Sequence, residues 1–282
     1  MLRAQGRLAP LRVGQLLLHF PRADWEEQAA AFAAALADAT LQPGLTRVRL
    51  INADARQEDV MDALVDAMLA RRLPGLTLRT CTPPAGAPLA RLLAGGTLRQ
   101  LAVSGRALQA VPTFPDGPEH AAVLADALRG AHALTSLELY GVGLFEDVEA
   151  GTLLLGALMA HPSLQTLVVS GEVTRHQEAL GAALAAIVAA NAPALRQVSF
   201  DRNALGDFGL APILDALARN RHLRVLDIRR NAMSEELARA ALLPAVRACA
   251  SLRVLCCRNY FDDEPAATEA ELLVRRRAER NT

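Results

Sequence analysis

The sequence predicts an α/β fold in which a strand–loop–helix–loop unit repeats and stacks into an open, curved solenoid. Residues 194–205 read A-L-R-Q-V-S-F-D-R-N-A-L, and residues 222–233 repeat the pattern as H-L-R-V-L-D-I-R-R-N-A-M. Both fit L-x-x-L-x-L-x-x-N-x-L, whose positions we number from the first Leu. Between such segments apolar residues recur with helical spacing. Stacked units then place parallel strands on a concave face and the wider helices on a convex face.

The predicted strands are eight segments with apolar residues at positions one, four and six of this pattern. They begin at Leu45, Leu73, Leu98, Leu134, Leu164, Leu195, Leu223 and Leu252. Successive starts are separated by as few as 25 residues after Leu73 and as many as 36 after Leu98. A weaker match at Val13, Leu16 and Leu18 predicts an N-terminal capping strand.

The predicted helices lie between these strands. Leu210, Ile213, Leu214 and Leu217 form one apolar stripe, and residues 60–68 and 180–188 show the same period. Ser234 is a suitable N-cap for the helix that follows it. Helices are also expected at residues 25–38 and 264–280. The whole chain is therefore one continuous solenoid, with a capping strand and helix at 1–44, about eight repeats at 45–260 and a capping helix at 261–282.

A family resemblance follows from the segment N-A-L-G-D-F-G-L-A-P-I-L-D-A-L-A-R-N at residues 203–220. It resembles the ribonuclease inhibitor-like class of leucine-rich repeat, and the resemblance extends over residues 45–260. It implies a horseshoe-shaped binding scaffold without chemistry of its own. Several bacterial effector families delivered into host cells are built on such arrays, some of them fused to a ubiquitin ligase.

Position nine of the pattern, where an Asn or Cys side chain satisfies backbone groups of the turn, varies among the repeats. It is Asn203, Asn231 and Cys81 in three of them and Ala53, Arg106, Val142, Glu172 and Tyr260 in the others. A buried, unpaired charge is costly. We therefore expect Arg106 and Glu172 to turn outward and the Leu98 and Leu164 repeats to be irregular.

Prolines are expected to alter two repeats. Pro83, Pro84 and Pro88 leave room for only one or two helical turns in the Leu73 repeat. In the Leu98 repeat, Pro112, Pro115 and Pro118 form an insertion before a helix that is expected to start at His120.

The expected partner site is the concave face, because the side chains at positions three, five and seven point away from the core. The N-terminal end of this face is basic, its centre carries an acid and an aromatic ring, and its C-terminal end combines charges with an apolar strip. The candidate partner-binding residues are Arg47, Arg49, Arg79, Glu138, Tyr140, Asp201, Val225, Asp227, Arg229, Val254, Cys256 and Arg258.

Two alternatives to this interpretation stay open. Asp201 and Arg229 are neighbours across two strands, so they could simply form a cross-strand ion pair. A partner could also bind the proline-rich loops, the convex helices or the ends of the stack.

The sequence contains no recognisable catalytic, metal or cofactor motif. His132, His161 and His222 precede strands and are expected to cap turns, and Cys256 has no predicted histidine base beside it. Zero formal net charge and few aromatic residues argue against nucleic acid as a partner. No apolar run reaches the length that spans a membrane, and free cysteines indicate a reducing compartment. Arg3, Arg7 and Arg12 precede the first acidic residue, so a targeting signal there stays open.

We therefore expect a monomeric, non-catalytic scaffold without cofactors that binds a protein partner. All 30 basic residues are arginine, which is explained either by GC-rich codon usage or by avoidance of ubiquitin acceptor sites inside a host cell. The more specific expectation is a bacterial effector acting on a host protein, in the cytoplasm or delivered into the host. The alternative is the substrate-recognition part of a ubiquitin ligase.

Overall fold

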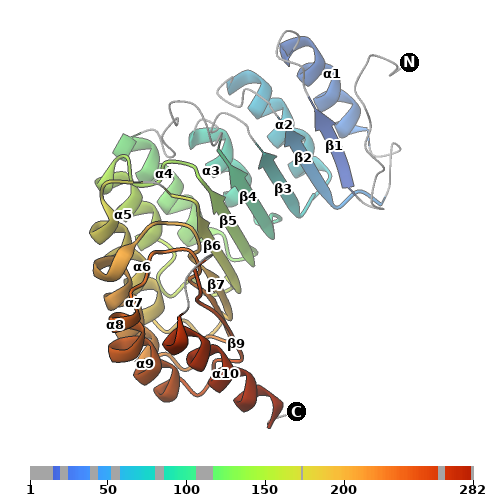
Figure 1. The fold of residues 1–282 in the computed structure, drawn as a ribbon. Helices are drawn as coiled ribbons and strands as arrows, with labels where there is room; N and C mark the ends of the chain where they lie inside the picture. Colours follow the sequence, from blue (N-terminus) through green and yellow to red (C-terminus); the bar gives the residue numbers. More distant parts are fainter. Residues whose placement is uncertain are drawn as a thin grey trace.

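The computed structural model describes residues 15–19, 25–38, 44–51, 58–79, 86–105, 117–172, 174–259 and 264–280. These residues form an arc with the strands on its inner side and the helices on its outer side (Figure 1). The strands are β1 (Gln15–His19), β2 (Arg47–Ile51), β3 (Gly75–Arg79), β4 (Gln100–Ser104), β5 (Ser136–Tyr140), β6 (Thr166–Ser170), β7 (Gln197–Ser199), β8 (Val225–Asp227) and β9 (Val254–Cys256).

Within the described residues the strands form one parallel sheet in chain order, β1 to β9. The register matches the repeat pattern position for position, so Arg47, Gly75, Gln100 and Ser136 are direct neighbours at position three. The predicted α/β solenoid with an open parallel sheet is therefore confirmed. The weak first match is confirmed as well, because Leu16 and Leu18 of β1 pair with Val48 and Leu50.

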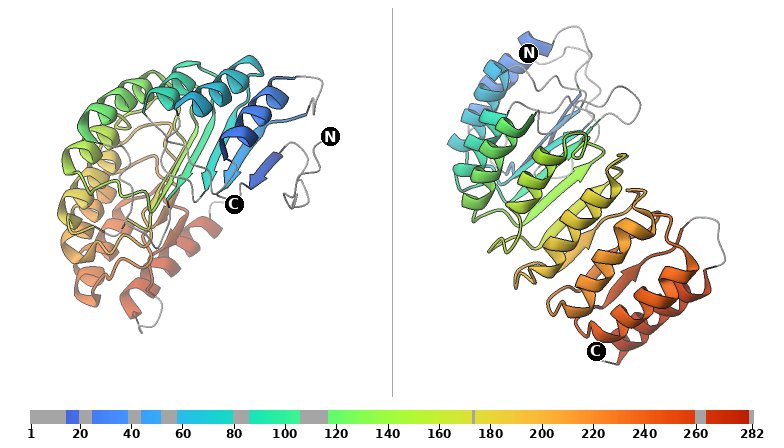
Figure 2. Two further views of the ribbon diagram at one scale, coloured as in Figure 1. Left: turned by 90° about the horizontal axis from the view of Figure 1, so that it is seen from above. Right: turned by 90° about the vertical axis from the view of Figure 1, so that its left-hand side faces the viewer.

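The helices follow the strands and cover the convex side (Figure 2). They are α1 (Trp25–Ala37), α2 (Glu58–Ala70), α3 (Gly86–Ala94), α4 (Gly117–Gly130), α5 (Val148–Gly156), α6 (Gln177–Ala189), α7 (Gly206–Arg219), α8 (Glu235–Leu237), the π-helical turn η1 (Ala238–Leu242), α9 (Leu243–Ala248) and α10 (Pro265–Glu279). Helix α10 packs against β9 and α9 and closes the C-terminal end of the stack.

The core lies between the sheet and the helices and is built from the predicted apolar positions. In the Leu195 repeat, for example, Leu195, Val198 and Phe200 are buried at positions one, four and six. Helix α7 contributes Leu210 and Leu214 from its predicted stripe. Each repeat thus buries its apolar face against its neighbours, as a solenoid requires.

Two of the helices differ from the expectation because prolines lie inside their first turns. Helix α3 extends from Gly86 to Ala94 and includes Pro88, so the expected one or two turns are too few. Helix α4 starts at Gly117 rather than at His120 and includes Pro118. A proline is tolerated in a first turn because its missing N–H would have no helical partner there. The other prolines named above lie outside the described residues.

Ser234 is confirmed as an N-cap, since its Oγ accepts a hydrogen bond of 3.0 Å from the backbone N–H of Leu237. The same hydroxyl donates to Oδ2 of Asp207 at 2.6 Å, and Asp207 lies on α7 of the preceding repeat. This cap therefore also holds two repeats together.

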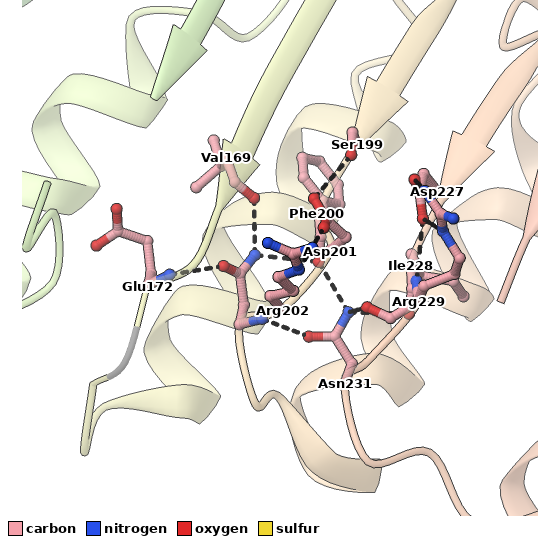
Figure 3. Close-up of polar contacts among 11 residues, drawn as sticks. Val169, Glu172, Ser199, Phe200, Asp201, Arg202, Asp227, Ile228, Arg229 and Asn231 are labelled. Carbon is pink, nitrogen blue, oxygen red and sulfur yellow. Dashed lines mark hydrogen bonds and ion pairs between the residues drawn. The ribbon is translucent and has the colours of Figure 1, made fainter. Parts of the chain in front are cut away.

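A ladder of side chains at position nine links successive repeats (Figure 3). Oδ1 of Asn203 accepts a hydrogen bond of 2.9 Å from the N–H of Glu172, one repeat earlier. The amide Nδ2 of Asn203 donates to the carbonyls of Val169 at 2.8 Å and Phe200 at 3.1 Å. Asn231 makes the corresponding contacts, accepting from the N–H of Asn203 and donating to the carbonyl of Phe200. Each asparagine thus satisfies buried backbone groups of two turns.

Glu172 occupies a place in this ladder, so the expectation that it turns outward is wrong. Its side chain is buried, and its two carboxylate oxygens each accept a hydrogen bond of 2.8 Å, from the N–H groups of Val142 and Leu144. Burial raises the pKa of this carboxyl, and these backbone donors oppose the rise. In the ladder, the Leu164 repeat therefore makes regular contacts to its neighbours, contrary to the irregularity expected there. Arg106, Ala53, Cys81 and Tyr260 lie outside the described residues.

A second set of contacts satisfies the turns before the strands. The ring of His161 is buried. Its Nε2 donates a hydrogen bond of 3.0 Å to the carbonyl of Leu128, and its Nδ1 accepts one from the N–H of Leu164. The predicted capping role is thus confirmed for His161. In the Leu223 repeat Asn220, rather than His222, plays this role, since Oδ1 of Asn220 accepts from the N–H of Leu223 at 2.8 Å.

Helices α6 and α7 approach each other closely at two glycines. A Cβ atom at Gly181 of α6 would lie 2.4 Å from the carbonyl oxygen and 2.5 Å from the Cα of Gly209 of α7. Only a residue without a side chain allows the two backbones this close.

Among the helices of the described residues, none is long and apolar enough to cross a membrane.

Candidate protein-binding surface

The concave face presents positions three and five of every repeat in two rows across the sheet, as predicted. Arg49, Thr77, Ala102 and Glu138, for example, are successive neighbours at position five. Neighbouring strands lie about 4.8 Å apart. Long side chains separated by one or two strands can therefore reach one another or a common ligand.

The N-terminal half of this face contains a hollow of about 360 Å³ over β2–β5. Its polar lining includes Arg47, Arg49 and Arg79 on one side and Glu138 and Tyr140 on the other. The structure thus brings together five of the candidate residues. The guanidinium Nε of Arg49 is buried without a hydrogen-bond partner among the described residues. Such a donor favours a ligand that can accept from it, because an unmade hydrogen bond at a buried site is costly.

Glu138 and Tyr140 act as a pair within the hollow. The Tyr140 hydroxyl donates to Oε2 of Glu138 at 3.1 Å, and Ser136 Oγ donates to Oε1 at 3.3 Å. Partial burial, the charge of Glu138 and this hydrogen bond together raise the pKa of Tyr140 to about 12. The ring therefore stays neutral and offers an apolar face beside three cations.

The charged residues at the C-terminal end of the face do not form the cross-strand pair considered above. Arg229 makes a bidentate contact with Asp227, two residues earlier in the same repeat, through Nε at 2.9 Å and Nη2 at 2.6 Å. Asp201 instead accepts from Ser199 Oγ at 3.2 Å and lies 3.6 Å from Nε of Arg202. Arg229 and Asp201 are therefore held by separate local partners, as Figure 3 shows.

The predicted apolar strip lies beside this ion pair. Val225 and Val254 are neighbours on β8 and β9, and Val254 is 46% exposed. Arg258, by contrast, is directed to the C-terminal helix, where its Nε lies 3.1 Å from Oε2 of Glu271. The strip thus ends at α10, and Arg258 belongs to the contact that closes the stack.

The geometry gives little support for chemistry at Cys256. Burial first, and then the charge of Asp227, raise the pKa of its thiol, whereas a nucleophilic cysteine needs a lowered pKa. Within the part of the chain that the structure describes, no group of three or more His, Cys, Asp or Glu residues could hold a metal ion.

The sequence reasoning missed a second hollow, of about 340 Å³, where β7–β9 begin. It is lined by Arg196, Arg221, His222, Arg224, Ser251 and Arg253. Three of these arginines occupy position two of successive repeats, directly before the concave row. Reading position two across the stack, as was done for positions three, five and seven, would have found them.

Comparison with known proteins adds no further constraint on the site. No protein-family model matches the chain, and no curated protein matches it.

Proposed function

We propose that this chain is a non-catalytic binding scaffold, a leucine-rich repeat protein of the ribonuclease inhibitor-like class, that holds a protein partner against its concave face. The observation that carries the proposal is the hollow over β2–β5, where three arginines and the ring of Tyr140 converge. Arginine and tyrosine dominate the energetics of many protein interfaces. A partner surface with a carboxylate and an apolar contact would match this lining.

The shape of the sheet supports the same proposal. Positions three and five form continuous rows from β2 to β9, so the face is long enough to contact a protein rather than a small molecule. The exposed Val254 and its neighbour Val225 offer a second contact zone at the other end. Both zones lie on one side of one sheet.

The test compares three immobilised proteins: the wild type, Arg49→Gln/Tyr140→Ala in the hollow, and Arg219→Gln/Phe208→Ala on α7. The control pair removes the same charge and also an exposed aromatic ring, since Phe208 is 82% exposed on the convex side. Each is used to capture proteins from a lysate, and the captured proteins are quantified by mass spectrometry. A partner is then purified and its Kd measured for all three.

We expect the hollow variant to weaken binding of that partner at least tenfold and the control to change it less than twofold. Two hot-spot residues of about 1–2 kcal/mol each would give a change of this size. If the control loses the partner and the hollow variant retains it, the convex side is the binding surface and the proposal fails.

A more specific version places the partner in a eukaryotic host cell. The feature that favours it is the absence of lysine from all 282 residues, since lysine is the side chain that is ubiquitinated. Arg129→Lys/Arg219→Lys adds two exposed acceptors on the convex helices and keeps the charge. Expressed in host cells, this variant should have a shorter half-life that a proteasome inhibitor restores. An unchanged half-life would favour codon usage as the explanation.

A further inference from the structure

The second hollow, at the edge of the sheet where β7–β9 begin, points to a further binding site. Backbone hydrogen bonds between neighbouring repeats fix the positions of its three arginines at position two. The N–H of Arg224 donates to the carbonyl of Arg196 at 2.8 Å, and the N–H of Arg253 donates to the carbonyl of Arg224 at 2.8 Å. These bonds stack the three residues directly beside one another, about 4.8 Å apart. Together with Arg221 they concentrate four positive charges along two strand spacings.

No carboxylate of the described residues compensates this charge. None of the four arginines forms an ion pair with an aspartate or glutamate in that part of the chain, whereas Arg219 and Arg229 nearby do. The Arg253 guanidinium donates instead to the carbonyls of Ala250 and Leu252. All four side chains are exposed or half-buried, so their guanidinium groups can be reached from solvent.

We propose that this edge binds a short acidic segment of a protein partner. The planar fork of arginine forms paired hydrogen bonds with a carboxylate. An extended segment places side chains on one side about every 6.6 Å, so two or three acidic residues would match the row from Arg196 to Arg253. The site is separate from the hollow over β2–β5 and does not depend on it.

The surroundings favour a short acidic peptide over nucleic acid. Asp227 lies three residues beyond Arg224, about 10 Å along the strand, and is already neutralised by Arg229. The positive field therefore ends close to the edge. Among the described residues, no Phe, Tyr or Trp lines the hollow, so this part of the chain offers no aromatic stacking of the kind that single-stranded nucleic acid uses. The formal net charge of zero gives no long-range attraction for a polyanion.

The experiment measures fluorescence anisotropy of a labelled peptide with six consecutive glutamates, using the full chain at low salt. The test variant is Arg196→Gln/Arg224→Gln/Arg253→Gln. The matched control is Arg129→Gln/Arg219→Gln/Arg275→Gln, which removes the same net charge from exposed helical ion pairs. Circular dichroism and Tm confirm that both fold. A six-glutamine peptide and a six-uridine RNA are the comparison ligands.

We expect the glutamate peptide to bind the wild type and the control within twofold of each other, and the test variant at least tenfold more weakly. The glutamine peptide should not bind. Equal loss in both variants would show that only net charge matters and would overturn the site. Tighter, arginine-dependent binding of the RNA would overturn the acidic peptide as its ligand. Arg49→Gln/Tyr140→Ala should bind the peptide like the wild type, which separates failure here from failure of the proposed concave site.

Discussion

Oδ1 of Asn231 accepts a hydrogen bond of 3.0 Å from the backbone N–H of Asn203, and 28 residues separate the two in sequence. The pair illustrates how this solenoid is held together outside its apolar core. The turn of one repeat is satisfied by a side chain that belongs to the next repeat. The stability of neighbouring repeats is therefore coupled through polar contacts as well as through packing.

Replacing Asn203 with alanine should cost roughly 2–5 kcal/mol of unfolding free energy, because it strands buried backbone groups that each cost about 1–3 kcal/mol. The groups that lose this partner are the N–H of Glu172 and the carbonyl of Val169. The carbonyl of Phe200 keeps its hydrogen bond from Asn231. Urea denaturation measures the loss. Gln177→Ala, at an exposed position of α6, is the control and should change the free energy by less than about 0.5 kcal/mol. Equal effects of the two substitutions would contradict the ladder.

The contribution of Glu172 to stability should decrease as the pH rises. Burial raises its folded pKa above the usual value of 4.5. The folded state then binds its proton more tightly than the unfolded chain, so stability is greatest below the unfolded pKa and is lost as pH rises through the folded pKa. Glu172→Gln removes this titration. The Tm of the wild type minus that of the variant should therefore fall as the pH rises above the usual carboxyl pKa. A difference that grows with pH would show that the backbone donors outweigh burial.

Gly181→Ala should destabilise the protein by about 1–3 kcal/mol, the usual range for overpacking. The added methyl would meet backbone atoms of Gly209 on α7, which cannot rotate away as a side chain could. Gly156→Ala is the matched control, because this glycine also lies in a helix but has no atom within 4 Å of an added Cβ. The control should be neutral or slightly stabilising, since alanine is the better helix former. Thermal unfolding of both variants checks the prediction.

Arg229→Glu/Val254→Asp should weaken partner binding at the C-terminal end of the concave face while leaving the circular dichroism spectrum unchanged. The first change replaces the cation that pairs with Asp227 by a second negative charge, and the second change places a negative charge in the exposed apolar strip. Binding of a purified partner, measured by calorimetry, is the readout. Unimpaired binding would confine the site to the hollow over β2–β5 or move it off this face.

The sequence predicts the strand order and register well. The register depends on the apolar residues at positions one, four and six of each repeat, which must be buried. Val198 and Phe200 can face only the core, so Gln197 and Ser199 can face only the concave side. The side-chain partners were less predictable. Register places Arg229 near both Asp201 and Asp227, and only the rotamers decide that it contacts Asp227.

Glu172 was misjudged for a related reason. A charge at a buried position is costly when it is unpaired, but the N–H groups of Val142 and Leu144 in the preceding repeat supply partners. Nothing in the Leu164 repeat itself indicates these donors. The basic edge at Arg196, Arg224 and Arg253 was missed because position two lies outside the strand rows that were compared.

In the position-nine ladder each side-chain oxygen accepts from a backbone N–H of the preceding repeat, and each asparagine Nδ2 donates back to a carbonyl of that repeat. At the C-terminal end of the array, the carboxylate of Glu264 accepts from the N–H of Asn259 at 3.1 Å and from its Nδ2 at 2.6 Å. The two ends of the array are therefore not equivalent. Shortening it from the N-terminal side removes donors and releases side-chain acceptors to water. Shortening it from the C-terminal side strands buried backbone groups of the turn that remains, so a redesigned array of these repeats would need a C-terminal cap, a place that the contact between Glu264 and Asn259 takes in this chain.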